Sequence, residues 1–253
     1  MTNLIIGNTS QLAQYMPTNF DRISSRNVNV VEIKDYKKIY VCFAEQRTFD
    51  NDLDFDKINY EYTLSLVDKL TAKCDKIIFY STAMLWENLE QYNIFDEFSY
   101  NEENKYLKSK ERITKELKKR KNVILHYPCN FNSTKRKGGY LFHKLMSACV
   151  GEKIQTGNLD FNREMVHTKY IAQRSLDSEQ SEIIAPGFLI NLFNFFGDVL
   201  NHFGVRENWS SVYMENKEKK HDSRHKNIDS KYDYDNLLND VIFDIENYRR
   251  SVL

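Results

Sequence analysis

A tyrosine and a lysine one helical turn apart are the residues whose spacing most directly suggests chemistry. Tyr106 and Lys110 begin a highly charged helix that we predict over 105–121, and positions i and i+4 share one helical face. Ile113 and Leu117 continue that face, so both polar side chains are expected on the inward side. A phenol exchanges protons poorly near pH 7, and a neighbouring ammonium lowers its pKa. The pair therefore predicts acid–base chemistry, although a chain with 16 tyrosines also produces this spacing by chance.

A hydroxyl group precedes this pair by some two dozen residues. Ser81 ends a strand that we predict over 76–81, and Thr82 follows it directly. In a parallel α/β sheet the carboxyl ends of the strands line the ligand crevice. Thr82 could there hydrogen-bond a substrate carbonyl or alcohol alongside Tyr106. The structural alternative is a hydroxyl that caps the following turn.

A glycine turn follows the first expected strand, Leu4-Ile5-Ile6. The segment Gly7-Asn-Thr-Ser10-Gln11-Leu12-Ala13 leads from this strand into a short helical stretch. Such a turn points backbone N–H groups at a phosphate. The dinucleotide-binding fingerprint has three glycines; only Gly7 is present here, and Ser10 and Ala13 are small enough to substitute. We therefore predict that Gly7, Ser10, Gln11 and Leu12 contact a pyrophosphate, against the alternative of an ordinary strand-to-helix turn.

The elements that would position these groups alternate between strand-like and helix-like, as in a parallel sheet covered by helices. Strands are predicted over 4–6, 20–24, 38–44, 76–81 and 122–127. The helix after the third strand repeats apolar residues every four positions, which predicts a buried stripe of Ile58, Tyr62, Leu66 and Leu70.

Beyond Pro128 the pattern changes to a polar loop over 133–139 and helices over 140–150, 188–203 and 232–253. We predict an α/β, Rossmann-like, doubly wound parallel sheet with a small C-terminal substrate lobe. Residues 1–165 would form mainly the dinucleotide-binding domain and residues 166–253 mainly the lobe, with interleaved segments.

Bulk composition limits the class of partner. Lys plus Arg and Asp plus Glu both number 36, which gives little support for a nucleic-acid surface. No apolar stretch approaches the roughly 20 residues that cross a bilayer, and the chain enters a strand directly after Met1. Four scattered cysteines indicate neither a metal site nor disulfides. We expect a cytoplasmic protein with a small-molecule partner and no membrane contact.

The glycine turn, the hydroxyl and the Tyr-xxx-Lys pair, in this order, resemble the extended short-chain dehydrogenases/reductases that modify nucleotide sugars. Asn59 falls where this family has an Asn in its long helix, and Asn122-Val-Ile-Leu-His-Tyr-Pro-Cys-Asn130 looks like the strand that usually reads Leu-Arg-Pro-x-Asn. Gly157-Asn-Leu-Asp-Phe-Asn-Arg163-Glu-Met-Val-His167-Thr-Lys169 is similar to a segment of GDP-mannose 4,6-dehydratases. Asp229-Ser230-Lys231 resembles the Asp-x-x-Lys element before the final helices. The resemblance runs from Leu4 to the C-terminal helix.

The resemblance implies a role for each matching residue. Thr82 would hydrogen-bond the sugar oxygen, Tyr106 would be the acid/base, and Lys110 would hold the cofactor ribose and lower the pKa of the tyrosine. Ala44 would contact the cofactor. Asn130 and Arg163 would bind the substrate, with Arg163 at the nucleotide diphosphate. The family also implies a homodimer.

Departures from the family decide the expected reaction. Dehydratases carry a Glu two residues after the catalytic Thr, and this chain has Met84 there, whose thioether cannot accept a proton. Dehydration is therefore not expected. Thr82, Tyr106 and Lys110 still support exchange of a hydride and a proton at an alcohol or ketone carbon, in a reductase or an epimerase.

The expected cofactor is NADP rather than NAD. An acidic residue at the tip of the second strand normally binds the adenosine ribose and repels a 2′-phosphate. Here the tip reads Ser24-Ser25-Arg26, and Arg26 can pair with that phosphate. Asp21 is the alternative if the second strand is shorter than predicted.

These observations predict an NADP-dependent reductase of a keto nucleotide sugar in surface polysaccharide or glycoconjugate biosynthesis. One alternative is a nucleotide-sugar epimerase with tightly bound NAD(P). Because two glycines of the fingerprint are missing and the chain is short between 24 and 38, a non-catalytic protein that binds a dinucleotide or a nucleotide sugar is another. A scaffold or assembly protein on this fold is a third.

Overall fold

The computed structural model describes residues 2–29, 32–46, 53–133, 141–212, 224–226 and 231–252. Most of the predicted loop over 133–139, and Asp229-Ser230, lie outside the described residues. The chain divides into two compact units. Unit 1 comprises Met1–Asn88, Ile94–Pro128 and Ile171–Ile184, and unit 2 comprises Leu89–Asn93, Cys129–Tyr170 and Ala185–Leu253.

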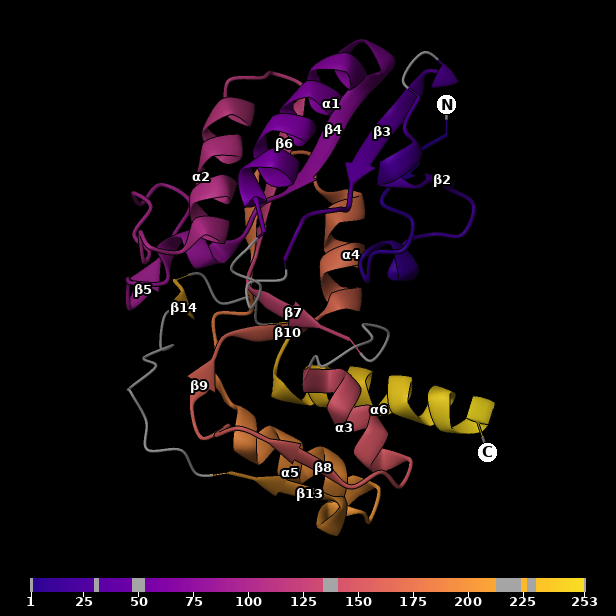
Figure 1. Ribbon diagram of the computed structural model, residues 1–253, viewed down its shortest axis with the longest axis vertical. Helices are drawn as coiled ribbons and strands as arrows, with labels where there is room; N and C mark the ends of the chain where they lie inside the picture. Colours follow the sequence, from indigo (N-terminus) through magenta and orange to yellow (C-terminus); the bar gives the residue numbers. More distant parts are fainter. Residues whose placement is uncertain are drawn as a thin grey trace. The chain divides into compact units, whose positions relative to one another are not determined.

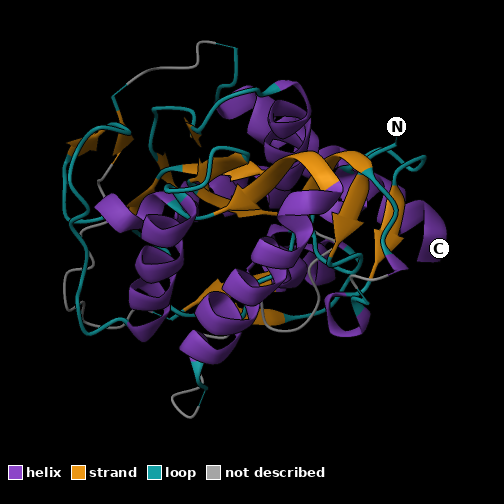
Figure 2. Cartoon of the chain, turned by 90° about the horizontal axis from the view of Figure 1, so that it is seen from above, coloured by secondary structure: helices purple, strands orange, loops and turns teal. Residues whose placement is uncertain are grey.

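A six-stranded parallel sheet forms the centre of unit 1 (Figure 1). Its order is β11-β6-β4-β3-β1-β2, and its twist is visible in Figure 2. The strands are β1 (Leu4–Ile6), β2 (Asp21–Ile23), β3 (Tyr36–Val41), β4 (Cys74–Tyr80), β6 (Val123–Pro128) and β11 (Glu182–Ile184). Because β2 and β3 lie on opposite sides of β1, the strand order reverses beside β1, which is where doubly wound sheets bind ligands. The predicted Rossmann-like fold class is confirmed.

The central strands are buried on both faces, as parallel strands covered by helices should be. All three residues of β1 and the last four of β3 and of β4 are buried. The five predicted strands are present with shifted ends. The third ends at Val41, three residues early, so Ala44 lies in the segment that follows it.

The helical segments of unit 1 are shorter than the sequence suggests. They are η1 (Ala13–Tyr15), η2 (Ser25–Asn27), η4 (Lys57–Tyr62), α1 (Thr63–Leu70), η5 (Thr71–Lys73), η6 (Ala83–Trp86) and α2 (Lys105–Leu117). Asn104 caps α2 by accepting a hydrogen bond of 3.2 Å from the backbone N–H of Leu107. The helix ends at Leu117, four residues before the predicted end.

The predicted apolar stripe after the third strand is wrong in its first half. Ile58 and Tyr62 are 37% and 38% exposed, whereas Asn59 and Thr63 are each 2% exposed. The reason is that η4 is a π-helix, in which hydrogen bonds join residues five apart. The wider turn rotates the residues before Leu66 relative to the predicted stripe, so that Asn59 and Thr63 take the buried positions in place of Ile58 and Tyr62.

The described part of unit 2 consists of helices and four two-stranded ribbons. Its strands are β5 (Gln91–Tyr92), β7 (Asn130–Asn132), β8 (Ile154–Thr156), β9 (Asn162–Arg163), β10 (Met165–His167), β12 (Ile190–Asn191), β13 (Trp209–Ser211) and β14 (Arg224–His225). Its helices are α3 (Leu141–Cys149), α5 (Leu192–His202), η7 (Arg206–Asn208) and α6 (Tyr234–Val252), and α4 (Thr168–Asp177) begins in unit 2 and continues in unit 1. None of the helices described is long and apolar enough to cross a membrane.

A buried carboxylate joins distant segments of unit 2. Glu164 accepts hydrogen bonds from the Tyr92 hydroxyl at 2.6 Å, from the backbone N–H of Gly187 at 2.7 Å and from that of His225 at 3.2 Å. Burial raises the pKa of Glu164. These donors come from β5, from a loop and from β14, so one side chain fixes three segments that are far apart in the sequence.

Gly7 is required by two independent constraints. Its φ of +96° lies in a region that residues with a Cβ rarely adopt, and a Cβ would meet the carbonyl of Cys42 and the Cβ of Phe43 at 3.1 Å. Gly151 has a similar φ of +103° with nothing within 4 Å of an added Cβ.

We expect Gly7→Ala to lower the free energy of unfolding by about 2–4 kcal/mol, from backbone strain and overpacking together. Gly151→Ala should cost only about 1–2 kcal/mol, because strain acts there alone. Urea denaturation of both variants measures the difference. Equal losses would show that the contact with Cys42 and Phe43 does not constrain Gly7.

Candidate functional site

Tyr106 and Lys110 lie on the buried face of α2, as the spacing predicts. Tyr106 is 8% and Lys110 is 2% exposed. The Lys110 ammonium donates a hydrogen bond of 2.8 Å to the carbonyl of Tyr80, the last residue of β4, and lies 4.9 Å from the centre of the Phe79 ring. Burial lowers the pKa of Lys110 to about 7. The helix therefore places its lysine against the carboxyl end of a central strand.

The two hydroxyls after β4 have different partners. Ser81 Oγ and Thr114 Oγ1, on α2, lie 2.6 Å apart and share a buried hydrogen bond. Thr82 Oγ1 accepts a hydrogen bond of 3.2 Å from the backbone N–H of Met84 and thereby caps η6. The capping role considered for Thr82 is thus real. It uses only the hydroxyl oxygen, so the hydroxyl hydrogen can still be donated elsewhere.

Asn59 connects α2 to the segment after β3. Its Oδ1 accepts from the backbone N–H of Glu45 at 2.8 Å, and its Nδ2 donates to the Glu45 carbonyl at 3.1 Å and to Ser109 Oγ at 3.1 Å. Ser109 donates in turn to the carbonyl of Tyr106 at 2.7 Å. The family resemblance had pointed to Asn59, but nothing in the sequence identified Ser109 as its partner.

Apolar groups surround the Tyr106 ring. Phe55, Tyr106 and Leu107 form a small cluster, and Met84 and Tyr100 pack against it. The rings of Phe55 and Tyr106 meet edge to face with their centres 6.0 Å apart. Met84, where dehydratases have a glutamate, therefore contributes a thioether to the surroundings of Tyr106.

The Gly7 turn is less open to a phosphate than the sequence suggests. The backbone N–H groups of Gly7 and Asn8 both donate to the carbonyl of Ile23, at 3.0 and 3.2 Å. The backbone N–H of Ser10 donates to the carbonyl of Gly7 at 3.0 Å, and the backbone N–H of Ala13 donates to Ser10 Oγ at 3.1 Å. The helix that follows, η1, has only three residues, so little helix dipole reaches the turn.

The NADP hypothesis requires Ser25 and Arg26 to follow the carboxyl end of the second strand and Asp21 to lie away from it. Register places Asp21 level with Leu4 at the beginning of β2, away from the carboxyl edge. Its carboxylate accepts from the Tyr36 hydroxyl at 2.9 Å and pairs with Lys34 at 2.8 Å, and the hydrogen bond from Lys34 lowers the pKa of Asp21. The strand ends at Ile23, so Ser25 and the exposed Arg26 follow the carboxyl end, and Asp21 does not compete for that position.

The remaining predicted residues belong to unit 2. Asn130 begins β7, and its Nδ2 donates to the carbonyl of Glu164 at 3.4 Å. Arg163 lies in β9, with its guanidinium carbon 5.5 Å from the centre of the Phe161 ring. Gly7, Ser10, Gln11, Leu12, Ser25, Arg26, Ala44, Thr82, Tyr106 and Lys110 all belong to unit 1.

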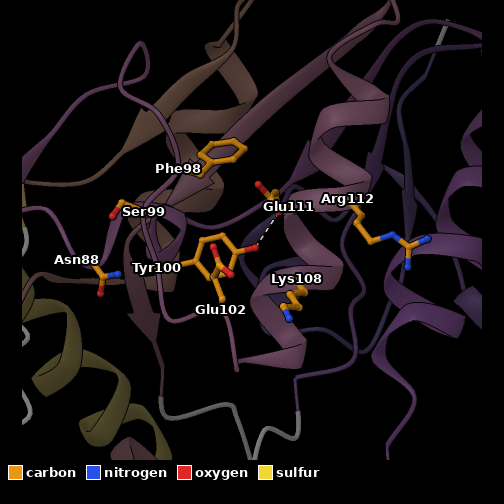
Figure 3. Close-up of a pocket in the computed structure, with 8 residues that line it drawn as sticks. All are labelled: Asn88, Phe98, Ser99, Tyr100, Glu102, Lys108, Glu111 and Arg112. Atoms are coloured by element: carbon orange, nitrogen blue, oxygen red, sulfur yellow. Dashed lines mark hydrogen bonds between the residues drawn. The ribbon is translucent and has the colours of Figure 1, made fainter.

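A cavity of about 550 Å³ lies beside α2, but it is not the site of these residues (Figure 3). Tyr100 lines it, and the Tyr100 hydroxyl donates to Glu111 Oε2 at 2.8 Å. The same ring packs against the cluster around Tyr106. The other lining residues are Asn88, Phe98, Ser99, Glu102, Lys108 and Arg112.

Comparisons with known proteins identify the fold. No protein-family model matches the sequence, and no curated protein matches it significantly. Many solved structures are similar over nearly the whole chain, among them the following three. MoeE5 in complex with UDP-glucose and NAD has a TM-score of 0.76 at 13% identity and covers 100% of both chains. A UDP-N-acetylglucosamine 4-epimerase from Methanobrevibacter ruminantium M1 has a TM-score of 0.79 at 12% identity and covers 99% of each chain. A dTDP-4-dehydrorhamnose reductase from Clostridium acetobutylicum has a TM-score of 0.76 at 14% identity and covers 98% of this chain and 100% of the other. The fold implied by the resemblance to extended short-chain dehydrogenases/reductases is confirmed.

Burial of Lys110 predicts a pH-dependent stability. Its pKa falls from 10.5 to about 7 on folding, so the unfolded chain binds more protons between these values. The contribution of Lys110 to the free energy of unfolding should therefore rise from pH 7 to pH 10. In Lys110→Met this rise should be absent, whereas Lys108→Met, on the exposed side of the same helix, should retain it. Urea titrations at pH 7, 8, 9 and 10 measure the slopes; parallel curves for wild type and Lys110→Met would contradict the lowered pKa of Lys110.

Arg26 predicts a preference between two cofactors. Arg26→Ala should weaken NADP binding about tenfold or more, the loss expected for a charge-assisted hydrogen bond to phosphate, and should leave NAD binding nearly unchanged. Lys34→Ala is a matched control, because Lys34 pairs with Asp21 at the other end of the strand. Calorimetric titration with both dinucleotides tests this. Tighter binding of NAD by the wild type would overturn the assignment.

Proposed function

We propose that the protein is a cytoplasmic, homodimeric, NADP(H)-dependent reductase of a keto nucleotide sugar that supplies surface polysaccharide or glycoconjugate synthesis. The observation that carries the proposal is the meeting of α2 with the end of β4. There Tyr106 and Lys110 share one buried helical face, and Lys110 bonds the residue two positions before Thr82. The likeness to nucleotide-sugar epimerases and reductases in fold supports the substrate class.

The residues that would hold the cofactor lie at the carboxyl edge of β1, β2 and β3. Ser10, Gln11 and Leu12 would face the pyrophosphate, since the N–H groups of Gly7 and Asn8 already bond Ile23. Ser25 and Arg26 would bind the 2′-phosphate, and Ala44 would lie beside the cofactor. When bound, the reduced nicotinamide supplies the hydride.

The protein's own part in the reaction is the transfer and stabilisation of a proton. As the substrate carbonyl is reduced, the Tyr106 hydroxyl donates its proton to the developing alkoxide oxygen. The Thr82 hydroxyl donates a hydrogen bond to the same oxygen. The Lys110 ammonium supplies positive charge in a low-dielectric environment, where it acts more strongly than in water. With a pKa of about 7, this charge is lost as the pH rises above neutrality.

Unit 2 would bind the nucleotide part of the substrate. Arg163 presents a guanidinium, which matches the oxygens of a diphosphate in a two-point hydrogen bond. Asn130 adds an amide. Neither residue bears on the chemistry itself.

A second candidate is nucleotide-sugar epimerisation with tightly bound NAD(P). The likeness to a 4-epimerase favours it, and the same hydroxyl, phenol and ammonium would serve. A third candidate is a non-catalytic protein that binds a dinucleotide or a nucleotide sugar; it is favoured by the Gly7 turn, whose N–H groups at Gly7 and Asn8 already bond the carbonyl of Ile23.

A substrate panel distinguishes the three. The reductase should oxidise NADPH when given a nucleotide 4-keto-6-deoxysugar and should not dehydrate GDP-mannose, because Met84 offers no base. Tyr106→Phe should lower the rate about 100-fold or more through loss of the acid. Tyr100→Phe is the control, because its hydroxyl bonds Glu111 and not the reacting group.

NADPH absorbance and NMR of the sugar read out the panel. Interconversion of sugars without net consumption of NADPH would identify an epimerase. Binding of a dinucleotide or a nucleotide sugar without any turnover would identify the non-catalytic protein. Dehydration of GDP-mannose would overturn the interpretation of Met84.

A further inference from the structure

Three segments of unit 1 meet at Tyr62. Its hydroxyl donates a hydrogen bond to the backbone carbonyl of Ser25, immediately before Arg26. Its ring is tilted by 53° to that of Phe43, with the ring centres 5.7 Å apart. Ser25 follows β2, Phe43 follows β3, and Tyr62 ends η4, so the contact joins the ends of the two strands that flank β1 to a helix.

The π-helix is what directs Tyr62 to this place. In a regular α-helix Tyr62 would lie one turn before Leu66 on the buried face. The wider turn of η4 instead buries Asn59 and leaves Tyr62 38% exposed. Single π-turns in proteins occur frequently at functional sites. The same distortion therefore aims Asn59 at α2 and Tyr62 at the tip of β2.

The contact at Tyr62 lies beside the tip of β2, at the edge of the sheet. β2 is the edge strand of the described sheet, so no further strand in the described chain flanks its tip on the outer side. The tip of the second strand is where a doubly wound sheet holds the adenosine ribose. Tyr62 and the half-buried Phe43 offer aromatic surface there, and the faces of aromatic rings bind purine bases by stacking.

We propose that Tyr62 determines specificity at the adenosine end of the cofactor site, an inference that rests on the proposed use of NADP(H). Its hydroxyl fixes the Ser25 carbonyl and so positions Arg26 for the 2′-phosphate. Its ring, with that of Phe43, forms the surface against which the adenine packs. Tyr62 is thus a positioning residue through its hydroxyl and a binding residue through its ring.

Binding experiments with adenosine fragments distinguish the role of the Tyr62 hydroxyl from that of the Tyr62 ring. The full chain is titrated calorimetrically with ADP and with 2′,5′-ADP, which differ in the 2′-phosphate that Arg26 would bind. Tyr62→Phe removes only the hydroxyl and should weaken 2′,5′-ADP binding three- to tenfold while changing ADP binding less than twofold. Tyr62→Leu removes the ring as well and should weaken both ligands at least fivefold. Tyr60→Phe, two residues away in the same π-helix, should bind both as the wild type does.

The outcomes separate this inference from the proposed function. A wild type that binds neither fragment nor NADP overturns both. A wild type that binds NADP in an Arg26-dependent way, with both Tyr62 variants unchanged, overturns the inference alone. Equal weakening of ADP and 2′,5′-ADP by Tyr62→Phe overturns the positioning role. Melting temperatures of the variants near that of the wild type confirm that folding is intact, as expected for a side chain that is one-third exposed.

Discussion

Burying an ammonium group is costly unless it has a polar partner, so the buried Lys110 needs a hydrogen-bond acceptor within unit 1. Its partner is the backbone carbonyl of Tyr80 at the end of β4, so α2 must pass the end of this strand one turn after Tyr106. The next residue, Ser81, adds a hydrogen bond to Thr114, one turn further along α2. Thr82 then follows at the beginning of η6. One buried charge thus fixes the relation between the strand end and the helix that carry all three proposed catalytic side chains.

Asn59 extends this constraint to the other half of the sheet. A buried amide must satisfy both its donors and its acceptor, and Asn59 does so with Glu45 after β3 and Ser109 on α2. The segment that would contact the cofactor and the helix that would carry the acid are therefore held by one side chain. The π-turn of η4 is the local distortion that makes this possible, since it replaces an apolar residue by an amide on the inward face.

The fold and the Tyr-Lys face could be predicted from the sequence because they depend on local patterns. Buried parallel strands appear as apolar runs, and a one-turn spacing places two residues on one helical face wherever the helix is regular. The burial of Ile58 and Tyr62 was predicted wrongly because that regularity fails there, and nothing in the composition of 57–62 announces a π-helix.

Other features escaped prediction because they depend on partners distant in the sequence. Glu164 receives donors from Tyr92, Gly187 and His225, whose convergence no short segment encodes. The short ribbons of unit 2 are of the same kind, since each pairs two or three residues across a long interval. The sequence predicted a glycine turn at Gly7. It could not predict that the N–H groups of Gly7 and Asn8 bond the carbonyl of Ile23, because this depends on the register of β2.

The late position of β11 in the chain has a consequence for biosynthesis. Residues 182–184 complete the sheet by pairing with β6, all six residues of which are buried. During synthesis the outer edge of β6 therefore stays unpaired until more than fifty further residues, most of them belonging to unit 2, have left the ribosome. An exposed apolar edge of this kind recruits other strands and promotes aggregation. Nascent chains of this protein should accordingly depend on chaperones in this interval, and a fragment ending near residue 165 would keep the open edge permanently.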